Sequence, residues 1–186
     1  MASILNVDQI NNAAGTSAVT IDASTGKPSF PNGAVLPAGS VLQVVQATTN
    51  TATTSTSTSF TDTALTASIT PSSASNKIVI LTQGNIHLTN NQYNTFALLN
   101  LLRGSTQLMI NGFSSDDAVG SGTGPTTCGS AVLNWVDTTH ASTSALTYKV
   151  QVKIGQTSYS ASATYNKNIG FGGNNYAQMI LMEIAG

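Results

Sequence analysis

The strict alternation of side chains in Leu146–Ile154 limits the fold of this chain more than any other feature. Tyrosine, valine and isoleucine side chains occupy every second position, and threonine, glutamine and lysine side chains lie between them. A period of two is typical of a β-strand with one buried and one wet face, whereas a helix would spread the apolar side chains around its circumference. The segment therefore predicts a strand whose inner face covers a core.

Other segments after residue 40 predict neighbouring strands separated by turns. They are residues 40–46, 60–70, 77–88, 97–103, 107–110, 131–137, 158–165 and 177–184. Residues 78–81 are continuously apolar, which favours a strand covered on both sides. Residues 96–102 also fit two helical turns, but the Gly104-Ser105 turn that follows them favours a hairpin.

Three segments between these strands predict irregular structure. Residues 48–59 form a threonine- and serine-rich loop or an edge segment, and residues 114–129 and 166–175 form further loops. Roughly eight strands spaced by turns, without a helix, predict an all-β chain. We expect an antiparallel β-sandwich, jelly-roll-like, that forms a head carrying an extended N-terminal arm.

The first 40 residues predict that arm rather than a domain. Glycine and proline recur between Gly15 and Gly39 and interrupt regular structure, leaving short β-like pieces at residues 18–22 and 28–30 around a turn. About 40 residues without a disulfide or a metal rarely fold alone. We therefore expect an arm at residues 1–40, ordered only against other chains, and a head domain at residues 41–186.

The shortage of charge narrows the range of partners. Charged residues make up 7% of the chain and the net charge is −1, against a usual charged share of about 25%. This predicts no nucleic-acid partner, and no apolar run approaches the ~20 residues that membrane insertion needs. A surface so poor in charge invites contact with other chains, so we expect subunits to share it; the alternative is the neutral surface of a monomer.

No arrangement of residues indicates bond chemistry. His140 follows Asp137 by three residues and serine is abundant, but the G-x-S-x-G elbow of hydrolases is absent. Asp116 and Asp117 are expected at a solvated loop tip, where they would make at most a loose Ca²⁺ site. We expect no enzyme activity, no catalytic residues and no cofactor.

The candidate zinc ligands are equally scattered. His87, Cys128 and His140 show none of the short spacings of zinc sites, so we expect no metal. Cys128 is the only cysteine, which excludes an internal disulfide, and it is expected to be a small buried side chain.

Aromatic and amide side chains near the C-terminus suggest one binding site. A ring can cover the apolar face of a sugar while amides bond its hydroxyls. The residues proposed to contact a receptor or glycan are Tyr165, Asn166, Asn168, Asn174, Asn175 and Tyr176. The alternative, which we favour, is that the rings pack into the core or a subunit interface.

Two stretches resemble proteins of tailed bacteriophages. The first resembles the N-terminal arm of tail-fibre and related appendage proteins, notably of marine and cyanobacterial phages, and consists of residues 4–8 (ILNVD), 15–22 (GTSAVTID) and 26–33 (GKPSFPNG). The second is similar to the β-sandwich heads of that group and consists of residues 40–46 (SVLQVVQ), 65–71 (LTASITP) and 76–80 (NKIVI).

This resemblance implies a virion structural protein. It implies a homotrimer whose arm is anchored to other virion proteins, of the tail or the capsid, and whose head is displayed for adhesion to the host surface. The anchoring side chains would be Ile4, Leu5, Val7 and Ile10. The family shares no catalytic residues, and the short arm leaves open a short tail fibre, a tail adaptor or a capsid decoration protein.

The expected location follows from the same features. The start of the chain lacks the basic and apolar regions of a secretory signal, and none of its asparagines has Ser or Thr two places on. We expect synthesis in the host cytoplasm, incorporation into the virion and release by lysis. The rival interpretations are a carbohydrate-binding module without catalytic activity and, less favoured, a depolymerase of host polysaccharide.

Overall fold

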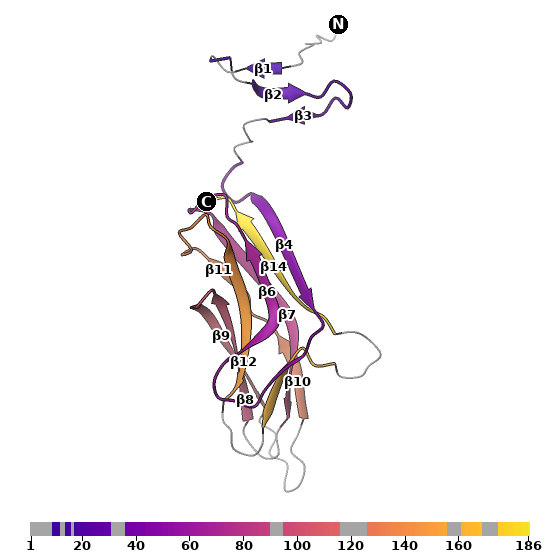
Figure 1. Cartoon of the computed structure of the whole chain (residues 1–186), viewed down its shortest axis with the longest axis vertical. Helices are drawn as coiled ribbons and strands as arrows, with labels where there is room; N and C mark the ends of the chain where they lie inside the picture. Colours follow the sequence, from indigo (N-terminus) through magenta and orange to yellow (C-terminus); the bar gives the residue numbers. More distant parts are fainter. Residues whose placement is uncertain are drawn as a thin grey trace. The chain divides into compact units, whose positions relative to one another are not determined.

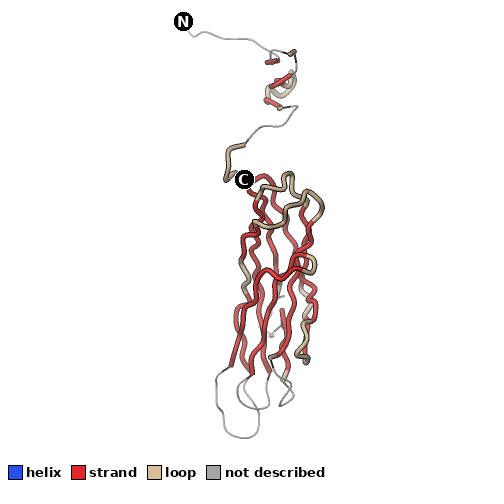
Figure 2. Tube along the Cα trace, turned by 90° about the vertical axis from the view of Figure 1, so that its left-hand side faces the viewer, coloured by secondary structure: helices blue, strands red, loops and turns tan. Residues whose placement is uncertain are grey.

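The computed structural model describes residues 9–11, 14–15, 17–30, 36–89, 95–115, 126–155, 161–168 and 175–186. The chain divides into two compact units, Met1–Pro37 and Ala38–Gly186, which we call the arm and the head (Figure 1). The described residues contain no helix, and hence no helix that could cross a membrane (Figure 2).

The arm contains a small antiparallel sheet. Its strands are β1 (Gln9–Asn11), β2 (Ser17–Ile21) and β3 (Pro28–Ser29), in the order β1-β2-β3. Asp22 closes the turn after β2, because its Oδ1 atom accepts hydrogen bonds from the backbone and hydroxyl groups of Ser24 and Thr25 over 2.7–3.0 Å. Gly26 completes the turn with a φ of 65°, a conformation that favours glycine. The two β-like pieces expected here are confirmed.

The head consists of two antiparallel sheets. Its strands are β4 (Val41–Thr49), β5 (Thr53–Ser55), β6 (Thr61–Ile69), β7 (Lys77–Thr89), β8 (Thr95–Arg103), β9 (Thr106–Ser115), β10 (Thr126–Ala131), β11 (Trp135–Asp137), β12 (Leu146–Ile154), β13 (Ser162–Tyr165) and β14 (Ala177–Ile184). The large sheet has the order β4-β14-β7-β13-β5, with β10 and β11 also paired to β7. The small sheet has the order β6-β12-β8-β9.

The strand order is that of a jelly roll. β10 pairs with residues 84–89 of β7 and β11 with residues 78–80, so they are two pieces of one interrupted strand. If the main strands are lettered B to I along the chain (β4, β6, β7, β8, β9, β10 with β11, β12, β14), the sheets read B-I-D-G and C-H-E-F. The expected antiparallel, jelly-roll-like β-sandwich is confirmed.

The core lies between the two sheets and is built from the alternating strands. In β12, Tyr148, Val150, Val152 and Ile154 are all fully buried, as the alternation predicts. Its neighbours β6 and β8 in the small sheet contribute Leu65, Ile69 and Leu101, and the facing large sheet contributes Ile78, Ile80, Ile86, Leu88, Met179 and Leu181. Burying each large aliphatic side chain contributes about 1.5–3 kcal/mol, so the head has its own source of stability.

Two expectations about irregular segments are wrong. Of the loop expected at residues 114–129, residues 114–115 belong to β9 and residues 126–129 to β10, and residues 132–134 interrupt what was expected to be one strand over 131–137. Cys128 is exposed, not buried, because it pairs with His87 on a stretch of β10 whose alternate side chains point away from the core.

Candidate functional site: the outer face of the large sheet

The register of the large sheet places one apolar row on its outer face. Met182 of β14 pairs with Val44 of β4 and Val79 of β7, and Val79 pairs in turn with Val136 of β11. Paired residues of antiparallel strands point to the same side of the sheet. These four side chains therefore form a continuous row across four strands, and Val44 and Val136 are 58% and 49% exposed at its ends.

A second row lies beside the first. Ile180 of β14 pairs with Leu81 of β7, and Gln46 of β4 lies on the other side of Ile180. At the opposite end of the sheet, Ile184 lies between Val41 and Lys77. Lys77 is the only charged residue among the described residues of these rows. We call the surface formed by Val41, Val44, Val79, Leu81, Val136, Ile180, Met182 and Ile184 the apolar face.

A chain of three amides borders the apolar face. Gln46 Nε2 donates to Gln178 Oε1 over 3.4 Å, and Gln178 Nε2 donates to Gln83 Oε1 over 3.5 Å. The three glutamines come from β4, β14 and β7. Each amide keeps further donor and acceptor capacity, since a side-chain amide carries two N–H donors and two acceptor lone pairs.

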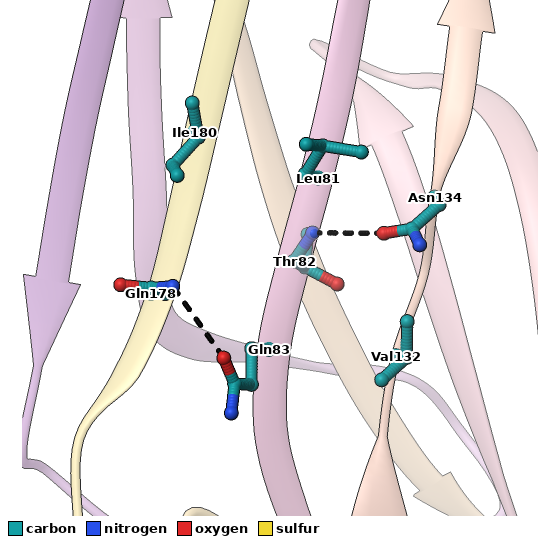
Figure 3. A pocket seen from close by; sticks show the side chains of 7 residues that line it. All are labelled: Leu81, Thr82, Gln83, Val132, Asn134, Gln178 and Ile180. Atoms are coloured by element: carbon teal, nitrogen blue, oxygen red, sulfur yellow. Dashed lines mark hydrogen bonds between the residues drawn. The ribbon is translucent and has the colours of Figure 1, made fainter.

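An open hollow of about 310 Å³ lies where β10 and β11 are interrupted (Figure 3). Here Thr82 replaces the missing ladder bonds: its hydroxyl donates to Leu133 O over 3.0 Å and accepts from Leu133 N over 2.8 Å. Its backbone N–H donates to Asn134 Oδ1 over 3.2 Å. Leu81, Val132 and Ile180 supply apolar walls, and the other lining residues are Thr82, Gln83, Asn134 and Gln178. The lining of the hollow fits an apolar side chain of another protein chain, with a polar backbone group of that chain beside it.

The residues expected to contact a glycan do not lie together on the surface. Tyr165 and Asn166 are each only 1% exposed, and Asn166 Nδ2 donates to Thr49 O over 3.0 Å. Burial removes both side chains from a sugar platform, which corrects that expectation, and for Tyr165 it confirms the favoured alternative that the ring packs into the core. Asn168 is exposed, Asn175 is partly exposed and Tyr176 is 58% exposed. Asn174 lies outside the described residues.

The residues expected to anchor the arm are only partly described. Ile10 lies in β1 and is 51% exposed. Ile4, Leu5 and Val7 lie outside the described residues, as do Asp116 and Asp117. The anchoring role of Ile4, Leu5, Val7 and Ile10 stays a prediction.

Sequence reasoning missed a buried carboxylate at one end of the head. Glu183 is fully buried and accepts hydrogen bonds from Gln43 Nε2 (2.5 Å), Asn76 Nδ2 (2.5 Å), and the backbone N–H and hydroxyl of Ser72 (2.7 and 2.8 Å). Burial raises the pKa of Glu183, but these hydrogen bonds outweigh burial and lower the pKa to about 2. Uncharged donors thus hold an ionised side chain inside the fold.

Asp137 and His140, weighed above as parts of a hydrolase, have separate structural partners. Asp137 Oδ2 accepts from Arg103 Nη1 over 2.5 Å and from the Tyr148 hydroxyl over 2.8 Å. Burial raises the pKa of Asp137, but hydrogen bonds, including that from Arg103, outweigh burial and lower it. His140 Nε2 donates to Asn76 O over 2.8 Å. The Asp137 contacts join the large sheet to β8 and β12 of the small sheet.

Comparisons with known proteins add little to this geometry. No family model matches the chain, and the curated proteins yield no match. Among solved structures, infectious bursal disease virus Gx strain gives a TM-score of 0.35 at 10% identity over 89% of this chain. The VP2 subviral particle of that virus gives 0.35 at 13% over 90%, and its Gt strain 0.30 at 9% over 91%.

The chain spans 42% of the length of each of these viral chains. TM-scores of this size carry no argument about the role of the protein.

Proposed function

We propose that the protein is a structural component of a virion that acts through assembly and binding, without catalysis. In the finer form of the proposal it is a trimeric, tail fibre-like appendage of a tailed phage. The arm holds the protein to other virion proteins, and the head is displayed for adhesion to the host surface. The sequence resemblance of residues 4–33 and 40–80 to phage appendage proteins supports this form.

The observation that carries the proposal is the exposure of large apolar side chains in the described part of the arm. Ile10 and Phe30 are 51% and 50% exposed, and Leu36 is 46% exposed. The described strands of the arm are two to five residues long, too short to bury much apolar surface. A segment with this composition gains stability when its apolar side chains pack on another chain, which suits an anchor.

The apolar face of the head supports assembly as well. Soluble monomers rarely expose large contiguous apolar patches, and such patches mark interaction sites. A capsid decoration protein would use the same two features, the exposed apolar side chains of the arm and the apolar face, and is the nearest alternative.

A carbohydrate-binding module is the second candidate, favoured by one observation. Tyr176 is 58% exposed, and Asn175 next to it donates from Nδ2 to Lys167 O over 2.6 Å. An exposed ring beside an oriented amide suits a sugar. Saturable binding on a glycan array would favour this candidate if it is lost in Tyr176→Ala. It should be kept in Thr147→Ala, a control variant at an exposed position of the small sheet.

The proposed function is tested in particles of the virus that encodes the chain. Mass spectrometry of purified particles is expected to detect the protein at a fixed copy number. A chain lacking residues 1–37 is expected to keep the thermal unfolding of the head, because the core lies in residues 38–186, and to be lost from particles. Normal occupancy of the truncated chain would refute the anchoring role, and absence of the full chain from particles would refute the virion role.

A further inference from the structure

We propose that the apolar face of the large sheet binds a second copy of this chain. The inference rests on the proposed function as an assembling virion protein, and it assigns to this face a contact between two copies that is separate from the three-fold contact of a trimer. It concerns the head alone and requires no particular position on a particle.

The first step is that β7 is buried by the core on one side of the sheet and remains partly exposed on the other. Residues 78–81 alternate across the sheet: Ile78 and Ile80 are fully buried in the core, whereas Leu81 is 37% exposed and Val79 is partly exposed on the other side. A continuously apolar strand is typical of a sheet covered on both sides. The described residues of the head cover only one side, and we assign the second cover to another molecule.

The second step is the chemistry of that cover. Only Lys77 carries charge in the described rows of the face, so the face offers a charged partner no electrostatic complement. Two identical uncharged faces meet without repulsion. Their amide chains also match, because Gln46, Gln178 and Gln83 both donate and accept hydrogen bonds. Self-complementarity of this kind favours a copy of the same chain that meets the face around a two-fold axis.

The third step is the hollow beside Leu81. Interfaces gain most of their affinity where a side chain of one partner fills a desolvated pocket of the other. The hollow lies within the apolar face and is bordered by the same amide chain, so an apolar side chain of the second copy can enter it while its neighbours bond to Gln83 or Gln178. Leu81 lies on both the hollow and the apolar rows, which makes it the position to change.

The test compares two variants of the full-length chain by sedimentation velocity over a range of concentrations. Leu81→Glu places a charge on the apolar face, and Ala64→Glu places the same charge on an exposed position of β6 in the small sheet. Because Leu81 is 37% exposed, the new carboxylate stays in water in a single copy. We expect the dissociation constant of self-association to rise about 30-fold or more in Leu81→Glu, the scale of an interface hot spot, and to stay unchanged in Ala64→Glu.

A second measurement uses the unmodified chain and so does not depend on folding of a variant. Hydroxyl-radical labelling of Met182 is expected to slow when the chain is concentrated enough to associate, while labelling of Phe96 on the small sheet stays constant. Equal effects of the two variants, together with constant Met182 labelling, would overturn the assigned surface and leave association through the arm intact. A chain that stays monomeric at every concentration yet is found in particles would also overturn it and assign the face to a different virion protein.

Discussion

The outer face of the large sheet differs in chemistry from the β6 and β12 part of the small sheet, although β8 and β9 of the small sheet also expose Phe96 and Ile110. On the small sheet, Lys149 Nζ lies 2.8 Å from Asp62 Oδ2, and Gln151 Nε2 donates to Asp62 Oδ1 over 2.6 Å. Asn100 Nδ2 extends this network by donating to Gln151 Oε1 over 3.2 Å. On the large sheet the corresponding positions carry the valine, leucine, isoleucine and methionine side chains of the apolar face.

The difference lies in how far each sheet follows the usual pattern of one buried and one polar face. Antiparallel sheets commonly pack one face on the core and leave the other to water, with polar residues on the wet side. The small sheet follows this pattern through β6 and β12. The large sheet departs from it through β7 and β14, so its outer side has the composition of a surface that another protein covers. Under the proposal that two copies associate, the β6 and β12 surface stays exposed to water and the apolar face is covered in the complex.

The largest expected effect separates the two sides of β7. Ile80→Ala removes a fully buried side chain and is expected to lower the free energy of unfolding by about 2–5 kcal/mol at any protein concentration. Leu81→Ala, one residue further, is expected to cost less than about 1 kcal/mol in the dissociated chain, because its side chain is already partly in water. Urea unfolding at several concentrations measures both. A large loss for Leu81→Ala in dilute solution would break the distinction.

The second effect concerns the acid on the inner side of the large sheet. The pKa of Glu183 is about 2 in the folded chain, below its usual 4.5. The unfolded chain therefore takes up the proton first as the pH falls, so the stability from Glu183 is present above pH 4.5 and is lost between about pH 4.5 and pH 2. This shift corresponds to about 3 kcal/mol at most. Denaturant unfolding across this range measures the loss.

Glu183→Gln is the variant that isolates this contribution. Its amide cannot accept all four hydrogen bonds as a carboxylate does, so we expect lower stability at pH 7 and a shallower loss on acidification. Asp62→Asn serves as the control, since Asp62 belongs to the wet face. An acid profile that is steeper in Glu183→Gln than in the original chain would show that other groups dominate acid unfolding.

The sequence predicted the fold well where alternating apolar and polar side chains mark a strand with one buried face. The bounds of β12 and β14 agree with their expected ranges, because each strand buries alternate side chains. The interruption at residues 132–134 could not be foreseen, since it depends on the hydroxyl of Thr82, about fifty positions away. The register that aligns Val44, Met182, Val79 and Val136 is likewise set by pairing between distant strands.

The candidate site shows the same limit. The continuous apolar run in β7 predicted a strand covered twice, which is the signal that leads to the apolar face. For Glu183, alternation with Met179 and Leu181 indicates an inward acid, but its partners Gln43, Ser72 and Asn76 come from other parts of the chain. The burial of Tyr165 agrees with the favoured interpretation of its ring as a core side chain, and Tyr165 shares its side of β13 with the buried Ala163.

The smallest expected effect on stability comes from Asp62, on the polar outer surface of the small sheet. Hydrogen bonds from Lys149 and then Gln151 lower the pKa of Asp62, yet the Asp62 side chain is 54% exposed. Exposed ion pairs contribute about 0–1 kcal/mol and are screened by salt. Asp62→Asn is therefore expected to change the free energy of unfolding by less than about 1 kcal/mol, with the difference shrinking in 1 M salt, and to leave self-association unaltered. An association constant that changes with Asp62→Asn would mean that the small sheet also meets another chain, and the two faces would no longer differ in kind.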